Sequence, residues 1–267
     1  MLTRKEADAA AASLVEAEQS RRQIGLLSTR HEGMTIDDAY AVQDAFNRLK
    51  TDGGDRQTGW KIGLTSRAMQ AALQIDTPDS GVLFDSMAFD DGATVPKGRF
   101  IQPRIEAELA FVLHSELSGP DVTVLDVLRA TEVVMPVLEI LDTRIERVCS
   151  KTGRMRNVCD TIADNAANAG YVLGGSAVSP DGMDLRLVHA IVMRNGLVEE
   201  TGLAAGVLNH PARGIAWLAR RLSTLGQAIQ PGQVLLSGSF IRPIETAPGT
   251  TITADFGELG TLSCFFE

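Results

Sequence analysis

The stretch RIEAELAFVL, from Arg104 to Leu113, places two glutamates a single alanine apart inside an otherwise apolar run. Read with the two-residue period of a β-strand, one face of the stretch is a core pattern made by Ile105, Ala107, Leu109 and Phe111. The opposite face carries Glu106 and Glu108, whose backbone positions lie about 7 Å apart along a strand. Two such carboxylates beside small apolar neighbours repel each other unless a cation joins them or one takes a proton. The stretch therefore predicts a strand with an acidic site on one face.

A third carboxylate is expected from VMPVLEILD, where Glu139 lies between Leu138 and Ile140. A charge inside such an apolar strand is costly unless it has a fixed partner. Carboxylates that converge from two strands would make a hard, oxygen-only site, which favours Mg²⁺ or Mn²⁺ over zinc. A solvated sheet face is the alternative, and a pattern as short as ExE matches often by accident. Spacing alone leaves both interpretations open.

Length and composition are those of an ordinary globular protein. The chain has 267 residues, of which 44% are hydrophobic and 22% charged, enough for a sizeable core. The net charge of −9 and the lack of any Lys/Arg-rich run argue against nucleic-acid binding. The longest apolar stretches, such as LAFVL, are too short to span a bilayer, and MLTRKEADAA lacks the apolar core of a signal peptide. We therefore expect neither nucleic acid nor membrane as a partner.

The cysteines indicate a cellular compartment. There are three, at positions 149, 159 and 264, and no two form a CxxC pair. An odd number without such spacing argues against a disulfide framework or a structural zinc site. We expect a cytoplasmic protein.

The sequence pattern changes along the chain from a helical part to a strand-rich part. Thr3 opens a capping-box pattern that predicts a helix to about Leu26, and Thr35 opens a second that ends at Gly53. From about Gly59 onward short strands alternate with turns. One late helix interrupts them, with Pro211 in its first turn and a core face made by Ile215, Leu218, Ala219 and Leu222. The fold class is α+β. We expect a mainly helical N-terminal subdomain at 1–95 and a β-rich catalytic domain at 96–267.

Lys61 and Asp79 are candidates for acid/base work. Lys61, in GWKIGL, would share a strand face with Gly59 and Gly63, and the glycines would leave room for a ligand. Burial would lower the pKa of this lysine, whereas nearby carboxylates would raise it. A lysine paired structurally with a glutamate is the alternative. Asp79, in TPDSG, lies in a turn where an aspartate commonly bonds to the backbone.

Several segments together resemble one family. They are GWKIGLTSRAMQ, DTPDSGVLFD, PRIEAELAFVL, VLEILD, DTIADNAANAG, AAGVLNHPARGIAWLA and GSFIRP. Nearly the whole chain is similar to the fumarylacetoacetate-hydrolase superfamily, and within it to the bacterial 2-oxo-alkenoate hydratases of aromatic meta-cleavage pathways. The resemblance implies a mixed β-roll or barrel of the superfamily's C-terminal type and a homo-oligomer.

The resemblance also implies the roles of individual residues. Glu106, Glu108 and Glu139 match the glutamates that bind Mg²⁺ in the family, and Lys61 and Asp79 match its active-site pair. The catalytic positions are thus expected in the N-terminal part and the metal ligands in the β-rich part.

Three further residues are candidate substrate contacts. Arg104 lies on the face of the glutamates and could balance their charge or bind a substrate carboxylate through two hydrogen bonds. The resemblance implies that Ser239, in the late turn SGSFIRP, contacts the ligand carboxylate. The run TIADNAANAG is typical of capping and turn groups, but it lies near the site in the family, which makes Asp164 a candidate.

A Mg²⁺-dependent hydratase of a seven-carbon 2-oxo diacid is the function we expect, with Mn²⁺ as the alternative ion. A 2-oxo acid offers a carboxylate and a ketone oxygen to a metal with open positions, which polarises the ketone. The alternatives on the same scaffold are a pentenoate hydratase, a 4-oxalocrotonate-type decarboxylase and a C–C hydrolase. A hydrolase usually needs a His/Glu pair, and His31 is in a loop-like context. A non-enzymatic acidic binding module is the last alternative, which the apolar setting of Glu139 disfavours.

Overall fold

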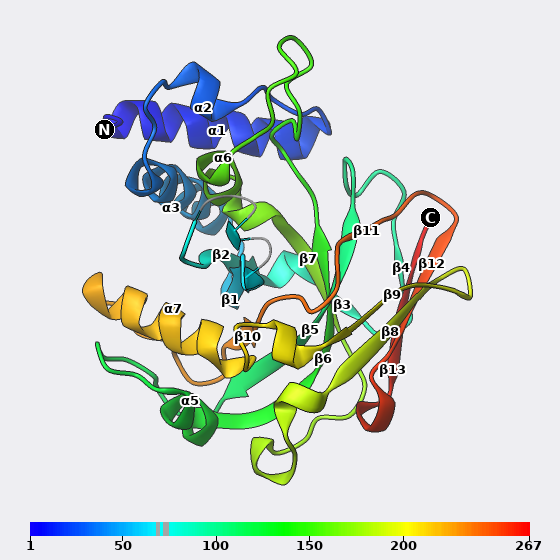
Figure 1. Ribbon diagram of the computed structural model, residues 1–267. Helices are drawn as coiled ribbons and strands as arrows, with labels where there is room; N and C mark the ends of the chain where they lie inside the picture. The colour runs from blue at the N-terminus through cyan, green and yellow to red at the C-terminus, as the bar shows by residue number, and fades with distance from the viewer. Residues whose placement is uncertain (68–69, 72–74) are drawn as a thin grey trace.

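A computed structural model describes residues 1–67, 70–71 and 75–267 of the chain. Within this part the expected α+β architecture is confirmed, with helices gathered on two sides of mixed β-sheets (Figure 1). Ala68 and Met69, in the segment GWKIGLTSRAMQ, lie outside the described residues. The α-helices are α1 (Arg4–Ser20), α2 (Leu27–Arg30), α3 (Ile36–Asp52), α5 (Val124–Ala130), α6 (Val158–Ala163) and α7 (Ala212–Thr224).

The predicted N-terminal helices both begin at their capping boxes. The hydroxyl of Thr3 accepts from the Glu6 N–H at the start of α1, and Thr35 caps α3 in the same way. Helix α1 ends at Ser20, so the expectation that it continues to about Leu26 was wrong. Arg21 adopts a left-handed backbone with φ 58°, and its N–H bonds to the carbonyl of Ala17, which closes the last turn.

The helices α1 and α3 pack together with α6 around a small apolar cluster of their own. This cluster contains Leu14, Val42 and Phe46, all buried. The apolar residues that the sequence predicts on the inner face of α7 are likewise buried: Ile215, Leu218, Ala219 and Leu222. No helix among the described residues combines the length and the apolar character that a membrane span requires.

The larger sheet has the strand order β2-β1-β10-β5-β6-β7-β3, and β11 pairs with β5 at one end. Its strands are β1 (Gln57–Gly63), β2 (Asp79–Phe84), β3 (Ala88–Asp90), β5 (Arg104–Leu113), β6 (Thr131–Leu141), β7 (Asn168–Leu173), β10 (Val234–Leu236) and β11 (Ile244–Glu245). The smaller sheet has the order β4-β13-β12-β8-β9. It consists of β4 (Ala93–Val95), β8 (His189–Arg194), β9 (Leu197–Leu203), β12 (Thr250–Asp255) and β13 (Thr261–Phe266).

The sheets join the two parts of the chain that the sequence analysis separates. Strand β1 pairs in parallel with β10, and β4 pairs in parallel with β13. The side chain of Lys61, on β1, comes within 3.5 Å of Glu139 on β6, although Lys61 precedes β5 by more than forty positions. The division into residues 1–95 and 96–267 stays a prediction.

The predicted alternation of β5 is present in the structure. The residues at 105, 107, 109 and 111 belong to the main core, where they pack with the smaller sheet and α7. Ala110, on the opposite face, belongs to a second cluster with Val137 and Leu236. Strand β5 is thus covered on both sides, and its glutamates face a largely buried space.

Candidate metal centre and active site

Three glutamates meet at the middle of the larger sheet. In the antiparallel ladder of β5 and β6, Glu106 lies directly opposite Glu139, and Glu108 follows two residues along β5. One carboxylate oxygen from each of the three glutamates lies within 4.8 Å of the others. Glu139 is fully buried, and Glu108 is exposed by only 1%. The structure therefore brings together the three residues that the sequence predicts as a metal-binding group.

The electrostatics of this group favour a bound cation. Burial, together with the neighbouring charge of Glu139, raises the pKa of Glu106 to about 7. Burial also raises the pKa of Glu108 well above its ordinary range, with Glu139 and Glu106 adding to the effect. Glu139 Oε2 is buried without a hydrogen-bond partner among the described residues. A buried acceptor in that state is costly unless another group satisfies it.

Two residues hold the other oxygen of Glu139. Lys61 Nζ lies 3.5 Å from Glu139 Oε1, and the side-chain amide of Asn168 donates to the same oxygen at 2.7 Å. Lys61 is 4% exposed. Burial lowers the pKa of this lysine, but the charges of Glu139 and Asp79 outweigh burial and raise it. The sequence indicates capping or turn groups for the run that contains Asn168, with the run near the site in the family. Its position at the start of β7, the strand beside β6, explains the contact.

Asp79 begins β2 and lies beside Lys61. The β1–β2 ladder pairs Asp79 with Gly63, and a Cβ built on Gly63 would lie 2.2 Å from Asp79 Oδ1 and 3.0 Å from Lys61 Nζ. Burial raises the pKa of Asp79, and the charge of Lys61 acts in the opposite direction. The Asp79 Oδ1 atom is buried without a hydrogen-bond partner in the described part of the chain. It is therefore not the simple turn residue that its sequence context suggests.

The structure explains the two glycines that flank Lys61 differently from the sequence, which indicates room for a ligand. A Cβ on Gly59 would lie 1.8 Å from the carbonyl oxygen of Val234, so this glycine permits the close approach of β1 and β10. Gly63 makes room for the Asp79 carboxylate. The expectation that both glycines clear space for a ligand was wrong for Gly59, whereas Gly63 does border the cavities described next.

Two cavities meet at the glutamates. The first, of about 710 Å³, is lined by Lys61, Asp79, Glu106 and a group of three arginines, Arg104, Arg147 and Arg156. The second, of about 330 Å³, is lined by residues that include Glu106, Glu108 and Ser239. A volume of several hundred Å³ is typical of small-molecule sites. Lys61, Asp79 and Arg104, predicted from separate segments, thus border one space.

Ser239 lies at the second cavity, but its hydroxyl is used within its own turn. Ser239 Oγ donates to the carbonyl oxygen of Ile241 at 2.9 Å and accepts from the N–H of the same residue at 3.2 Å. Gly238, which precedes Ser239, contacts the glutamates directly: its N–H donates to Glu108 Oε2 at 2.8 Å. A backbone donor of this kind leaves no signal in the sequence beyond the glycine itself.

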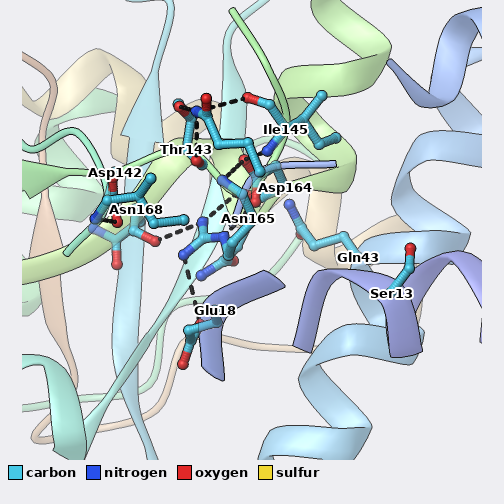
Figure 2. Close-up of polar contacts among 12 residues, drawn as sticks. Ser13, Glu18, Gln43, Asp142, Thr143, Ile145, Asp164, Asn165 and Asn168 are labelled. Carbon is cyan, nitrogen blue, oxygen red and sulfur yellow. Dashed lines mark hydrogen bonds and ion pairs between the residues drawn. The ribbon is translucent and has the colours of Figure 1, made fainter. Parts of the chain in front are cut away.

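Asp164 is not brought to the walls of either cavity. It ends α6, and its carboxylate pairs with the guanidinium of Arg144 and accepts from the Arg144 N–H at 2.9 Å. Arg144 also faces Glu18 of α1, 3.7 Å away. Figure 2 shows Glu18 and Asp164 in this buried ion-pair network. Asp164 thus ties the helical layer to the sheet, and no contact here supports its expected role as a substrate ligand.

The donor set fits a hard divalent cation. Three carboxylates face one ammonium, and one buried carboxylate oxygen lacks a partner in the described structure. Carboxylate oxygens are the ligands that Mg²⁺ and Mn²⁺ prefer, and three of them leave coordination positions for water or substrate. His31 is not among the described residues that line either cavity, so the acid/base pair of a hydrolase is missing there.

Comparison with known proteins agrees with this geometry. The chain is 51% identical to the 2-oxo-hept-4-ene-1,7-dioate hydratase of Escherichia coli, over 95% of each chain. It is 38% identical to the 2-keto-4-pentenoate hydratase of Paraburkholderia xenovorans, over 100% of this chain and 97% of the relative. No family model matches.

Solved structures extend the comparison to the fold. The 4-oxalocrotonate decarboxylase of Pseudomonas putida G7, complexed with magnesium and adipate, superposes with a TM-score of 0.94 at 34% identity, over 100% of this chain and 99% of that one. A fumarylacetoacetate hydrolase family protein of Yersinia pestis, at 12% identity and a TM-score of 0.55, covers 78% of this chain and 92% of its own and shares the fold alone.

The chain therefore has the fold of the fumarylacetoacetate hydrolase family protein, with a buried glutamate site at the middle of its larger sheet. It belongs to the family of hydratases and decarboxylases that match it over nearly their whole length.

Proposed function

We propose that this enzyme is a divalent-metal-dependent hydro-lyase that adds water to 2-oxo-hept-4-ene-1,7-dioate and forms 4-hydroxy-2-oxoheptane-1,7-dioate. The observation that carries the proposal is the cluster of Glu106, Glu108 and Glu139, with Lys61 3.5 Å from Glu139 and with Lys61, Asp79 and Glu106 on the wall of one cavity. The 51% identity to a hydratase of this substrate supports the same assignment. The reaction belongs to meta-cleavage catabolism of aromatic compounds, as in homoprotocatechuate degradation.

Glu106, Glu108 and Glu139 would hold the ion, with Mg²⁺ as our proposal and Mn²⁺ as the alternative. A divalent ion bound there supplies Lewis acidity, which polarises the ketone of a 2-oxo acid and stabilises the negative charge that develops on its oxygen. Gly238 and Asn168 fix the orientation of two of the carboxylates by donating hydrogen bonds to them. Such outer contacts tune the ligands of a metal site.

Lys61 and Asp79 would handle protons. The substrate's alkene, at C4–C5, must first move into conjugation with the ketone, which requires loss of a proton from C3 and return of one to C5. Water then adds at C4, and a proton returns to C3. Lys61 and Asp79 are buried beside each other on this cavity, where an acid/base pair is needed. Positive charge at the glutamates would offset the field that raises the pKa of Lys61.

A comparison of substrates distinguishes the proposed hydratase from a pentenoate hydratase and from a 4-oxalocrotonate decarboxylase. Rates with the Mg²⁺-loaded protein should be measured on three compounds: 2-oxo-hept-4-ene-1,7-dioate, 2-oxopent-4-enoate and 4-oxalocrotonate. We expect the highest kcat/KM for the seven-carbon diacid, and no release of CO₂ from 4-oxalocrotonate. Equal kcat/KM for diacid and pentenoate would move the assignment to the monoacid hydratases. Stoichiometric CO₂ release would move it to the decarboxylases.

The setting of the enzyme is part of the proposal. The cysteines at 149, 159 and 264 are free and buried, which suits a reducing cytoplasm. The family resemblance supports a homo-oligomer. Sedimentation of the native protein at micromolar concentration gives the assembly size directly, and a monomer would contradict this part of the proposal.

A further inference from the structure

The wall of the larger cavity carries more positive charge than the neighbouring protein groups neutralise. Arg104, Arg147 and Arg156 line it. Arg147 pairs with Glu245 and also donates to Gln102. Arg156, in contrast, has a buried guanidinium nitrogen, Nη1, without a hydrogen-bond partner in the described part of the chain. A buried cationic donor is stable only where an anion or acceptor meets it.

The position of Arg156 is fixed by its backbone. The segment from Arg147 to Arg156 folds back on itself, with the Arg156 N–H donating to the Arg147 carbonyl at 3.0 Å and a bridge between Val148 and Met155. Because Arg147 is anchored to Glu245, the segment holds Arg156 at the cavity wall without using its guanidinium. The guanidinium is thus placed and remains available to a ligand.

The charges around Arg156 also indicate an anion. Burial lowers the pKa of Arg156 below its usual value; Asp164 acts in the opposite direction, and Arg104 and Arg147 add repulsion. An incoming carboxylate would relieve that repulsion, and a planar guanidinium can bind it through two parallel hydrogen bonds.

Arg104 and Arg156 differ in where the fold places them relative to the three glutamates. Arg104 lies on β5 two residues before Glu106, and its charge lowers the pKa of that glutamate. Arg156 is joined through its backbone to Arg147, which pairs with Glu245, the register partner of Arg104 on β11. Neither Arg104 nor Arg156 lines the second cavity, where Glu108 and Ser239 are found. A 2-oxo acid with its ketone end at the glutamates would therefore meet Arg104 near that end and Arg156 further along its chain.

We infer that Arg156 binds the distal carboxylate of a dicarboxylic substrate and so selects diacids over monoacids. The inference deepens the proposed function and rests on it for the orientation of the substrate. Arg104 balances the charge of Glu106 and does not supply this selection. Arg156 is a specificity-determining residue, since it touches the end of the substrate that does not react.

A binding experiment tests this separately from catalysis. The saturated compounds 2-oxoheptanedioate and 2-oxoheptanoate have the same chain length but differ in the distal carboxylate, and neither contains an alkene to hydrate. Their affinities for the Mg²⁺-loaded protein are measured by isothermal titration calorimetry. We expect Arg156→Gln to weaken diacid binding about 10- to 100-fold, the range of a lost charged hydrogen bond, and monoacid binding far less.

Arg154→Gln is the matched control. Arg154 is exposed on the same segment, and its backbone N–H and carbonyl make its hydrogen bonds to Thr152 and Cys149. Its diacid affinity should equal that of the wild type. Arg156→Lys keeps the charge but not the planar guanidinium, so its loss of diacid affinity should lie between those of the wild type and Arg156→Gln. If thermal unfolding shows that Arg156→Gln does not fold properly, Arg156→Lys takes its place in the test.

The outcomes separate the inference from the function on which it rests. Parallel loss of both ligands in the Arg156 variants, or equal wild-type affinity for diacid and monoacid, overturns the inference. A wild type that prefers the diacid through Arg156 but hydrates no 2-oxo-heptenedioate would leave the inference standing and remove the proposed function.

Discussion

Glu106 and Glu139 are direct register partners in the antiparallel ladder of β5 and β6. Their side chains emerge on the same face of the sheet, because residues opposite each other in a ladder share a face. Like charges so placed destabilise a sheet unless a third group compensates them. Lys61, 3.5 Å from Glu139, compensates only in part, which makes a divalent ion the group we expect here.

The first prediction concerns Glu139. Glu139→Gln keeps the shape of the side chain but removes its charge, so Mg²⁺ affinity should fall by more than the roughly 10- to 100-fold typical of losing an outer contact. The rate on the diacid should fall with it. Titration calorimetry of Mg²⁺ and initial rates are the measurements, and Glu132→Gln, an exposed change on the same strand, is the control.

Chelation provides the complementary result. EDTA should abolish the activity of the wild type, and added Mg²⁺ or Mn²⁺ should restore it. Full activity of the Glu139→Gln protein in EDTA would falsify the metal account.

The second prediction follows from the raised pKa of Glu106, about 7 in the metal-free site. Below pH 7 this carboxyl is mostly protonated, so Mg²⁺ must displace a proton in order to bind. Affinity for Mg²⁺ should therefore fall as the pH is lowered from 8 to 6, with proton release on binding. Calorimetry in two buffers of different ionisation enthalpy measures that release, and a pH-independent affinity without it would contradict the assignment.

The third prediction separates proton transfer from charge balance at Lys61. Lys61→Met should lower kcat about 10²- to 10⁴-fold, the usual effect of losing an acid/base group, with Mg²⁺ and oxalate affinity largely unchanged. Asp79→Asn should act in the same direction. The double variant should lose less than the product of the two single effects if the pair works together.

If Lys61 only neutralises the glutamates, the pattern reverses. Removal of a cation 3.5 Å from Glu139 would tighten Mg²⁺ binding and change the rate little. Single-turnover rates measured beside Mg²⁺ titration of the Lys61→Met protein distinguish the two roles.

The fourth prediction concerns the helical layer. Asp38 accepts hydrogen bonds from the N–H groups of Leu2 and Thr35, which lower its pKa to about 2 from 3.8. Its folded pKa lies below the unfolded value, so its stabilisation is present above pH 3.8 and is lost as pH falls through about 2. Asp38→Asn should cost about 1 kcal/mol at neutral pH, as a lost cap does.

Denaturant unfolding at several pH values measures the difference in free energy of unfolding between the wild type and Asp38→Asn. It should shrink below pH 3.8 and vanish near pH 2. Asp37→Asn, an exposed change in the same first turn, is the control. A difference between wild type and Asp38→Asn that is constant with pH would show that the charge of Asp38 contributes nothing.

The sequence predicts the parts of the site that depend on local pattern. Alternation in β5 separates the glutamates from the core face, and an apolar context marks Glu139 as unusual. The site's remaining contacts depend on which strands pair, as with Asn168 on β7 and the backbone of Gly238, and pairing is not a local property. Gly59 also could not be explained from local sequence, because a side chain there would collide with the carbonyl of Val234, which is distant in sequence.

The helical layer shows where local pattern fails within one element. The capping box of α1 marks its start in the sequence, but the arginines, the glutamine and the leucines after Ser20 are residues that continue to favour helix. The helix ends where Arg21 turns left-handed, and two residues further on the side chain of Gln23 donates to Thr143 beside the sheet. That tertiary contact overrides local propensity.

Hydration is tested by identifying the product by NMR, with the Mg²⁺-loaded protein and 2-oxo-hept-4-ene-1,7-dioate in D₂O. We expect loss of the alkene signals, a new carbinol signal at C4, deuterium at C3 and C5, and no reaction with the Glu139→Gln protein. An unchanged alkene, or a product that has lost CO₂ in place of gaining water, would contradict the proposed hydration.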